Sequence, residues 1–230
     1  MNREVFRLQP IDTSTLHERA YLQLRNGLMA GLFRPGESVT LRGVADALGT
    51  SVMPIREAVR RLVSERALEM PNSRSIRVPS MSLAHFDELC ACRLLLEGEA
   101  AFQAAARCSP ALTARLADLD RQYGTFAAAG DTAAMLAANQ AFHFTLYRAG
   151  GSELLFSMIE TLWLQSGPYL NLFIASEDTA RELGETVAPS PHKDLLTALR
   201  RKRGEAARAA IVADISDAAI MYRARIEALS

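Results

Sequence analysis

The sequence predicts a mainly α-helical protein, with an N-terminal winged helix-turn-helix in residues 1–79 and a C-terminal all-helical antiparallel bundle in residues 80–230. Two observations predict this architecture. The segment Leu41–Leu62 has the pattern of a short helix, a glycine turn and a second helix with arginines on one face and aliphatic residues on the other. Beyond residue 82, apolar residues recur at helical spacing almost throughout, and runs of β-branched residues are scarce.

The composition narrows the class of protein. Apolar residues make up 49% of the 230 residues and charged residues 23%, which is typical of a globular chain long enough for two domains. No apolar run approaches the roughly 20 residues of a membrane span, and the N-terminus lacks the apolar core of a signal peptide. Cys90, Cys92 and Cys108 form neither a CxxC pair nor a disulfide framework. We therefore expect a cytoplasmic protein with no membrane partner.

The net charge of zero hides a difference between the two halves. Residues 1–80 hold 12 Arg and 8 acidic residues, a balance of +4, whereas residues 81–230 hold 14 basic and 18 acidic residues, a balance of −4. Of the 26 basic residues 24 are Arg, the side chain suited to bidentate contacts with phosphate and guanine. This division favours a DNA-binding module joined to a ligand-binding or dimerising module.

The N-terminal half predicts three helices and a wing. The first helix covers residues 16–30 and ends at Gly31, after which Pro35-Gly36 marks a turn. Thr40 caps a helix over residues 41–48, and Gly49 allows a sharp turn. Ser51 is the expected N-cap of the next helix, which has Pro54 in its first turn, where a missing N–H costs nothing. Asn72-Ser73 then predicts a turn between two extended stretches, which makes a two-stranded wing.

The stretch GESVTLRGVADALGTSVMPIREAVRRLVSERALEMPNSRSIRV closely resembles the winged helix-turn-helix of the GntR family of bacterial regulators, over about residues 15–79. The resemblance rests on four motifs: the PG turn, the L–AxxLG helix, the PxREAxRRL recognition helix and the PN turn of the wing. The resemblance implies DNA contacts by an arginine in each of the two helices, by the start of the recognition helix and by the wing tip. The expected DNA-binding residues are Arg42, Ser51, Val52, Met53, Arg56, Arg60 and Arg74.

The chain departs from the family pattern at two places. The family commonly has Ser-Arg-Thr where this chain has Ser51-Val52-Met53, so an arginine is missing, although Val52 and Met53 could contact a thymine methyl group. The family wing usually carries a glycine near position 74 or 75, where this chain has Arg74 and Ser75; Arg74 could reach a narrow minor groove. These departures put recognition of the usual family operator in doubt. The alternative is that these arginines form a solvent-exposed helix face and do not bind DNA.

The C-terminal half predicts six helices, at about residues 83–107, 110–128, 132–149, 152–175, 178–200 and 204–228. Pro168, Pro189 and Pro191 should kink or interrupt the fourth and fifth of these. The short connections favour an antiparallel bundle. Over about residues 82–217 this half resembles the FCD domain, and the helix count fits its VanR-like subgroup. The resemblance to the FCD domain rests on the segments ELCACRLLLEGEAA, NQAFHFTLYRAGGSELL and PHKDLLTALRRKRGEAARAAI.

The resemblance implies a metal held by an aspartate and three histidines, which match Asn139, His143, His192 and Asp214. Asn139 and His143 are four residues apart and share a helix face, as a chelating pair requires. This chain has Asn139 where the family has the aspartate, and Asp214 where the family has the last histidine. The set that remains has two nitrogen and two oxygen ligands. Such a set suits a divalent transition metal, Zn or Ni rather than Mn. The alternative is a metal-free polar pocket in which Asn139 and His143 form a simple hydrogen bond.

Three further residues are candidates for binding an effector. Arg93 matches an arginine that many FCD domains point into their cavity, where it would bind a carboxylate bidentately. Its alternative is an ordinary surface ion pair with Glu97, four residues on. Gln140 and Trp163 are candidates from position alone, and Trp163 is equally suited to the core.

Together these features predict a ligand-responsive transcription regulator, a repressor, that senses a small carboxylate effector and binds a palindromic double-stranded DNA operator as a homodimer. A metal-free sensor of a larger ligand, such as an acyl thioester, is one alternative. A metal-dependent enzyme is the other, but no general base, nucleophile elbow or phosphate loop accompanies the metal-binding set in the sequence. We therefore expect no enzymatic activity.

Overall fold

The computed structural model describes residues 15–80, 82–174 and 192–229. By their contacts, these residues form two compact units. The first comprises the chain up to Asn26 together with Ser38–Arg77, and the second comprises Gly27–Glu37 and everything from Val78 onward. The second unit thus includes the loop that follows the first helix as well as the C-terminal half.

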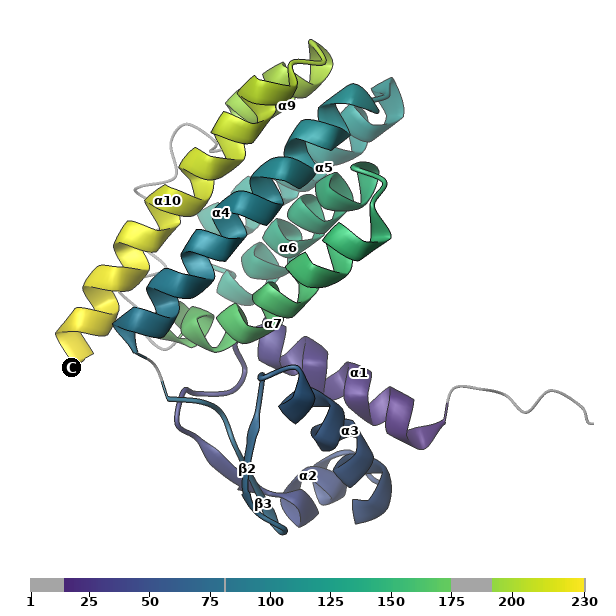
Figure 1. The fold of residues 1–230 in the computed structure, drawn as a ribbon, viewed down its shortest axis with the longest axis vertical. Coiled ribbons are helices and arrows are strands. Elements are labelled where there is room, and N and C mark those ends of the chain that lie inside the picture. The colour runs from purple at the N-terminus through teal and green to yellow at the C-terminus, as the bar shows by residue number, and fades with distance from the viewer. Residues whose placement is uncertain (1–14, 81, 175–191, 230) are drawn as a thin grey trace, which may run out of the picture. The chain divides into compact units, whose positions relative to one another are not determined.

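The first unit contains the predicted helix-turn-helix. Its helices are α1 (Leu16–Met29, whose last turn groups with the second unit), α2 (Leu41–Ala47) and α3 (Val52–Ser64) (Figure 1). The turn between α2 and α3 contains Gly49 at a φ of +62°, a conformation that favours glycine. The expected apolar face of α3 is confirmed, because Ile55, Val59 and Leu62 are completely buried.

The wing belongs to a three-stranded antiparallel sheet and not to a two-stranded one. Its strands β1 (Ser38–Thr40), β2 (Glu69–Asn72) and β3 (Ser75–Arg77) lie in the order β1-β3-β2. The expectation missed β1 because three residues after a Pro-Gly turn are too few to show the alternation of a strand. Between Glu69 and Asn72 the register of β2 against β3 shifts. This edge strand contains Pro71, which has no N–H to donate.

The two expected helix caps differ in their chemistry. Thr40 is the N-cap of α2, and its Oγ1 accepts a hydrogen bond of 3.0 Å from the backbone N–H of Gly43. Ser51 occupies the N-cap position of α3, but its side chain makes no capping hydrogen bond. Ser51 therefore begins the helix as expected without contributing a side-chain cap.

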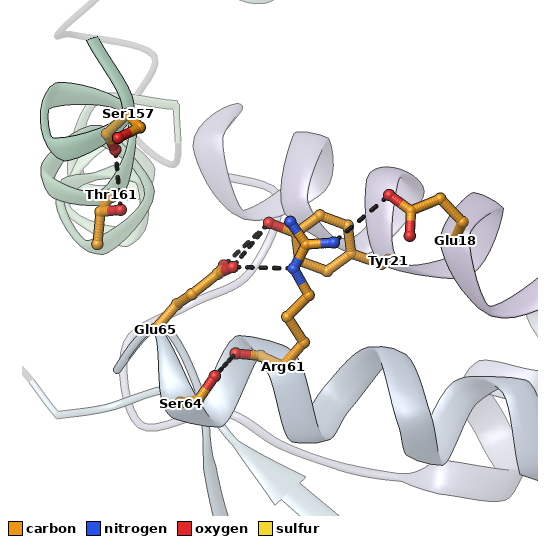
Figure 2. A network of polar contacts seen from close by, with 7 residues as sticks. All are labelled: Glu18, Tyr21, Arg61, Ser64, Glu65, Ser157 and Thr161. Carbon is orange, nitrogen blue, oxygen red and sulfur yellow. Dashed lines mark hydrogen bonds and ion pairs between the residues drawn. The ribbon is translucent and has the colours of Figure 1, made fainter. Parts of the chain in front are cut away.

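A polar network joins α1 to the recognition helix α3 (Figure 2). The Tyr21 hydroxyl donates to the carboxylate of Glu65 at 2.9 Å, and Arg61 Nε donates to the same carboxylate at 3.1 Å. The Arg61 guanidinium lies 3.7 Å from the centre of the Tyr21 ring, and its Nη1 is 3.4 Å from Glu18. Burial, helped by Glu65, raises the pKa of Tyr21 to about 12. Arg61 therefore holds two helices together and is not simply a solvated charge.

The second unit is the predicted helical bundle. It contains α4 (Leu83–Ala106), α5 (Pro110–Ala129), α6 (Thr132–Ala149), α7 (Glu153–Ile174), α9 (Lys193–Arg200) and α10 (Gly204–Leu229). The long helices α4 and α10 pack side by side, α5 packs on α6, and α4 also contacts α6 and α7 (Figure 1). Five of the six expected helices match closely. Of the helix expected at 178–200, Lys193–Arg200 is helical; residues 175–191, with Pro189 and Pro191, lie outside the described residues.

We expected Pro168 to kink or interrupt its helix, and an interruption is wrong, because α7 runs through Pro168 from Glu153 to Ile174. Proline removes one backbone donor, the N–H that would bond to the carbonyl of Leu164. Leu164 and Tyr169 on either side are both buried, so tertiary packing holds the helix together across the missing bond.

Among the helices of residues 15–80, 82–174 and 192–229, none is both long enough and apolar enough to cross a membrane.

Candidate functional site

Two histidines meet an aspartate inside the bundle of the second unit. His143 is on α6, His192 immediately precedes α9, and Asp214 is on α10. One potential ligand atom from each lies within 4.8 Å of the others. His143 and His192 are 3% and 1% exposed, and with Glu97 they make up the buried polar side chains of the described part. Three of the four predicted metal ligands are therefore brought together from separate parts of the chain.

The geometry of His143 is set from both sides of its ring. Nε2 is 3.3 Å from Asp214 Oδ2, and Nδ1 is 3.0 Å from the hydroxyl of Tyr147, one helical turn later on α6. Burial holds the pKa of His143 well below its usual value, and His192 and Arg93 lower it further. His143 is therefore a neutral imidazole, the form that binds metal ions.

The ring of His192 is oriented by a carboxylate and two aromatic rings. Its Nδ1 is 2.8 Å from Asp120 Oδ1 on α5. The ring stacks on Phe142, with centroids 3.8 Å apart, and meets Tyr123 edge-on at 5.8 Å. A carboxylate behind one ring nitrogen is the usual support for a histidine that binds metal through the other, which here is Nε2.

The fully buried carboxylate of Glu97 lies beside these histidines. Arg93 donates to it from Nε at 2.6 Å and from Nη2 at 3.5 Å, and the Tyr147 hydroxyl donates to it at 2.5 Å. The expected ion pair between Arg93 and Glu97 is therefore present, but it is not a surface pair: Glu97 is 0% and Arg93 20% exposed. Arg93 thus neutralises a buried charge of the protein itself.

These contacts determine which nitrogen of His143 carries the proton. A hydroxyl has one proton, and Tyr147 gives its proton to Glu97, an acceptor. Tyr147 can then only accept from Nδ1–H of His143, which leaves the lone pair of Nε2 directed at the carboxylate of Asp214. When Asp214 is ionised, two acceptors face each other at 3.3 Å, and the contact becomes favourable only with a proton or a metal ion between them. Burial raises the pKa of Asp214, which shows how unfavourable its negative charge is in this place.

The other expected residues of this half differ in their surroundings. Trp163 lies at the site, since its ring is 5.5 Å from that of His143 and 5.0 Å from the Arg93 guanidinium. Gln140 donates its amide to the sulfur of Met29 at 3.3 Å. Asn139 lies one turn before His143 on α6 and is partly exposed, and its role as a fourth ligand stays a prediction.

The sequence analysis missed Tyr147 and Asp120, which orient the two histidines. Tyr147 could have been found from its spacing, since it follows His143 by four residues and shares its helix face. Asp120 left no such signal, because it meets His192 across 72 positions and two different helices.

The expected DNA-binding residues are exposed or partly exposed in the first unit. Arg42 lies on α2, Met53 at the start of α3 is 63% exposed, and Arg74 is at the tip of the wing. Two have partners within the unit: Arg60 pairs with Glu57 at 2.8 Å, and Arg56 reaches the wing. The remaining two are Ser51 and Val52, at the start of α3. Their contacts with DNA stay predictions.

Replacing the buried carboxylate should be costly. We expect Glu97→Gln to lower the free energy of unfolding of the metal-free protein by about 3 kcal/mol, because Arg93 would keep a largely buried charge without its counter-ion. Glu99→Gln is the matched control: Glu99 pairs with Arg208 but is 42% exposed, and its loss should cost about 1 kcal/mol or less. Urea unfolding of both variants measures this, and equal losses would contradict a buried ion pair.

The neutral state of His143 predicts a pH dependence. In the unfolded chain this histidine takes up a proton near its ordinary pKa of 6.5, whereas the buried ring does not. The metal-free protein should therefore lose stability as the pH falls below about 6.5, with the unfolded state binding the extra proton. Asp214, whose pKa is raised, acts in the opposite sense. Urea midpoints of the parent and His143→Gln should diverge below that pH, and parallel curves would be inconsistent with a buried neutral ring.

Comparison with known proteins identifies both halves. Residues 16–78 match the family of bacterial regulatory proteins, gntR family, and residues 88–217 match the FCD domain. The HTH-type transcriptional regulator McbR of Escherichia coli (strain K12) is 31% identical over 185 residues, 80% of this chain and 82% of McbR. The HTH-type transcriptional repressor GlaR of the same organism is 28% identical over 147 residues, 62% of this chain and 67% of GlaR.

Solved structures agree with these matches. The structure of E. coli McbR/YncC superposes with a TM-score of 0.87 at 27% identity, covering 92% of this chain and 99% of that one. A putative GntR regulator from Rhodococcus sp. RHA1 shares the fold, with a TM-score of 0.72 at 22% identity over 90% of this chain and 96% of its own. McbR and GlaR are named as transcriptional regulators and not as enzymes. The chain belongs to the GntR family of bacterial transcriptional regulators, with an FCD domain behind its winged helix-turn-helix.

Proposed function

We propose that this regulator senses a small organic acid through a divalent transition metal held by His143, His192 and Asp214, with Asn139 as a fourth ligand. The observation that carries the proposal is the pair of acceptors that face each other, the Nε2 lone pair of His143 and the carboxylate of Asp214. Such a pair is unfavourable in a buried site unless a proton or a metal ion lies between its members, and a metal ion would use both as ligands. A metal ion would turn the repulsion into two ligand bonds.

The spacing of His143 and Asp214, and the surroundings of both histidines, fit a metal ion. Two ligand atoms each about 2.1 Å from a tetrahedral ion lie about 3.4 Å apart, close to the 3.3 Å between His143 Nε2 and Asp214 Oδ2. Both histidines have a hydrogen-bonding group behind the other ring nitrogen, Tyr147 in one case and Asp120 in the other. The set of nitrogen and oxygen ligands favours Zn or Ni over Mn.

The chemistry of the candidate metal site favours a small carboxylate as the effector. When bound, the metal would supply a positive centre for a carboxylate oxygen. Arg93 already neutralises Glu97, so the metal is the principal anchor for the acid and Arg93 offers only its remaining N–H groups. Trp163 lies beside both Arg93 and His143, where it would contact the apolar part of the effector.

We further propose that the protein is a repressor that binds a palindromic operator as a homodimer. The name of the relative GlaR, a transcriptional repressor, supports the first part. Two-fold operators are read by two-fold proteins, which supports the second. The neighbouring helices α4 and α10 expose the large apolar side chains Leu95 (73%) and Ile220 (69%), and a second copy of the chain would cover them.

Elemental analysis of protein purified without a histidine tag tests the metal site. We expect close to one Zn or Ni ion per chain in the parent and little in His143→Ala, because the variant loses a ligand. His17→Ala is the matched control, since His17 is exposed in the first unit, and it should keep the metal. If the parent binds no metal even after incubation with Zn, Ni or Mn, the proposal fails and a metal-free pocket replaces it.

Light scattering on a size-exclusion column tests the dimer. The parent should have twice the mass of one chain, and Leu95→Glu with Ile220→Glu should give monomers, because the interface would then bury two charges. Leu154→Glu changes an equally exposed leucine (69%) on α7 and should leave the dimer intact. A monomeric parent, or a dimer that withstands the double substitution, would rule out this interface.

A further inference from the structure

The tip of the wing is a hairpin turn without the backbone that hairpins favour. Asn72 pairs with Ser75, so Ser73 and Arg74 are the two central residues of the turn. Favoured two-residue turns, types I′ and II′, need a positive φ at one or both central residues. Neither Ser73 nor Arg74 has one, although both lie in the described part of the chain. The turn therefore depends on other contacts for its shape.

Three contacts hold this turn. Asn72 Oδ1 accepts hydrogen bonds from the backbone N–H groups of Arg74 at 2.9 Å and Ser75 at 3.0 Å. The carbonyl of Arg74 accepts from the N–H of Leu41, in the first turn of α2, at 2.9 Å. The carbonyl of Ser73 accepts from Arg56 Nη1 at 2.9 Å. The first contact is local, the second ties the wing to α2, and the third ties it to the recognition helix.

Arg56 can make this contact and still bind DNA. A guanidinium carries five N–H donors in a fixed plane, and the carbonyl of Ser73 accepts from Nη1 alone. The side chain is partly exposed, so the remaining donors are accessible to a base or a phosphate. The recognition helix and the wing tip are thereby linked through one side chain.

We propose that Arg56 is a positioning residue for the wing: it fixes the turn Ser73-Arg74 against α3 and so sets where Arg74 meets the DNA. This rests on the proposed binding to an operator and on the contact with DNA that the sequence predicts for Arg74. Arg56 then influences two parts of the operator, the bases next to the recognition helix and the flank next to the wing. A chain with glycine in its wing could form a primed turn by itself, whereas in this chain Asn72, Leu41 and Arg56 hold the turn, and Arg56 is the one that ties it to the recognition helix.

The first test uses the protein without DNA. We expect NMR relaxation to show greater mobility of the backbone amides of residues 73–75 in Arg56→Ala than in the parent. Arg60→Ala is the matched control, because Arg60 is on the same helix and pairs with Glu57. It should leave these amides unchanged. An equally rigid turn in Arg56→Ala would overturn the proposal, whatever the DNA measurements show.

The second test is a double-mutant cycle on DNA affinity. The probe is a duplex selected by the parent from a randomised library and given A·T-rich flanks. We expect Arg74→Ala to weaken binding about fivefold in the parent but less than about twofold in Arg56→Ala, because a wing that is no longer held cannot place Arg74. The cycle of Arg60→Ala with Arg74→Ala should be additive.

The outcomes separate this proposal from the one on which it rests. Additive losses for Arg56 and Arg74 would overturn the positioning role. If Arg74→Ala has no effect in the parent, the contact with DNA predicted for Arg74 is wrong, and the amide measurement alone decides whether Arg56 holds the turn.

Discussion

The buried carboxylate of Glu97 is the constraint on which the interior of the second unit depends. An ionised carboxylate without partners in a protein interior costs several kcal/mol, so its neighbours are required to supply charge and hydrogen bonds. Arg93 supplies the charge from one turn earlier on α4, and Tyr147 supplies a hydroxyl from α6. The pairing of α4 with α6 is thus specified by polar contacts as well as by apolar packing.

The same carboxylate controls the candidate metal site without belonging to it. Because Tyr147 must donate to Glu97, it accepts from His143, and the Nε2 lone pair of that ring is directed at Asp214. A metal bound there would join α6, the start of α9 and α10, three elements far apart in the chain. Binding would then stabilise one arrangement of these helices over others, which is how an effector on the metal could act beyond its own pocket.

The candidate metal site differs from the family pattern in the helix that supplies its carboxylate. In the family pattern the aspartate shares a helix with the first histidine, whereas here that position is Asn139 and the carboxylate comes from Asp214 on α10. The total charge of the ligand set is unchanged, but its negative end lies on a different helix. With a metal ion bound as proposed, the link between α6 and α10 would be stronger electrostatically than a second neutral histidine would make it.

Features encoded by neighbouring residues were predictable from the sequence, and features made by distant residues were not. The helix-turn-helix follows from local signals such as Thr40, Gly49 and the apolar face of α3. His143, His192 and Asp214 were found only through spacing shared with a family. The strand β1 and the pairing of Asp120 with His192 depend on long-range contacts that no short window contains. Pro168 does not end its helix, because tertiary packing outweighs a single lost hydrogen bond.

Arginine shows why composition alone overstates the DNA-binding surface. The excess of arginine in the first 80 residues predicts contacts with phosphate and bases, yet all three arginines on α3, Arg56, Arg60 and Arg61, have partners within the protein. Arg61 binds Glu65 and lies over Tyr21, and Arg56 donates to the carbonyl of Ser73 (Figure 2 for Arg61). Both still place positive charge near the DNA-binding face, so they contribute to its field. With Arg56 positioning the wing as proposed and Arg61 joining α1 to α3, these side chains would influence recognition through the shape of the unit as well as through its charge.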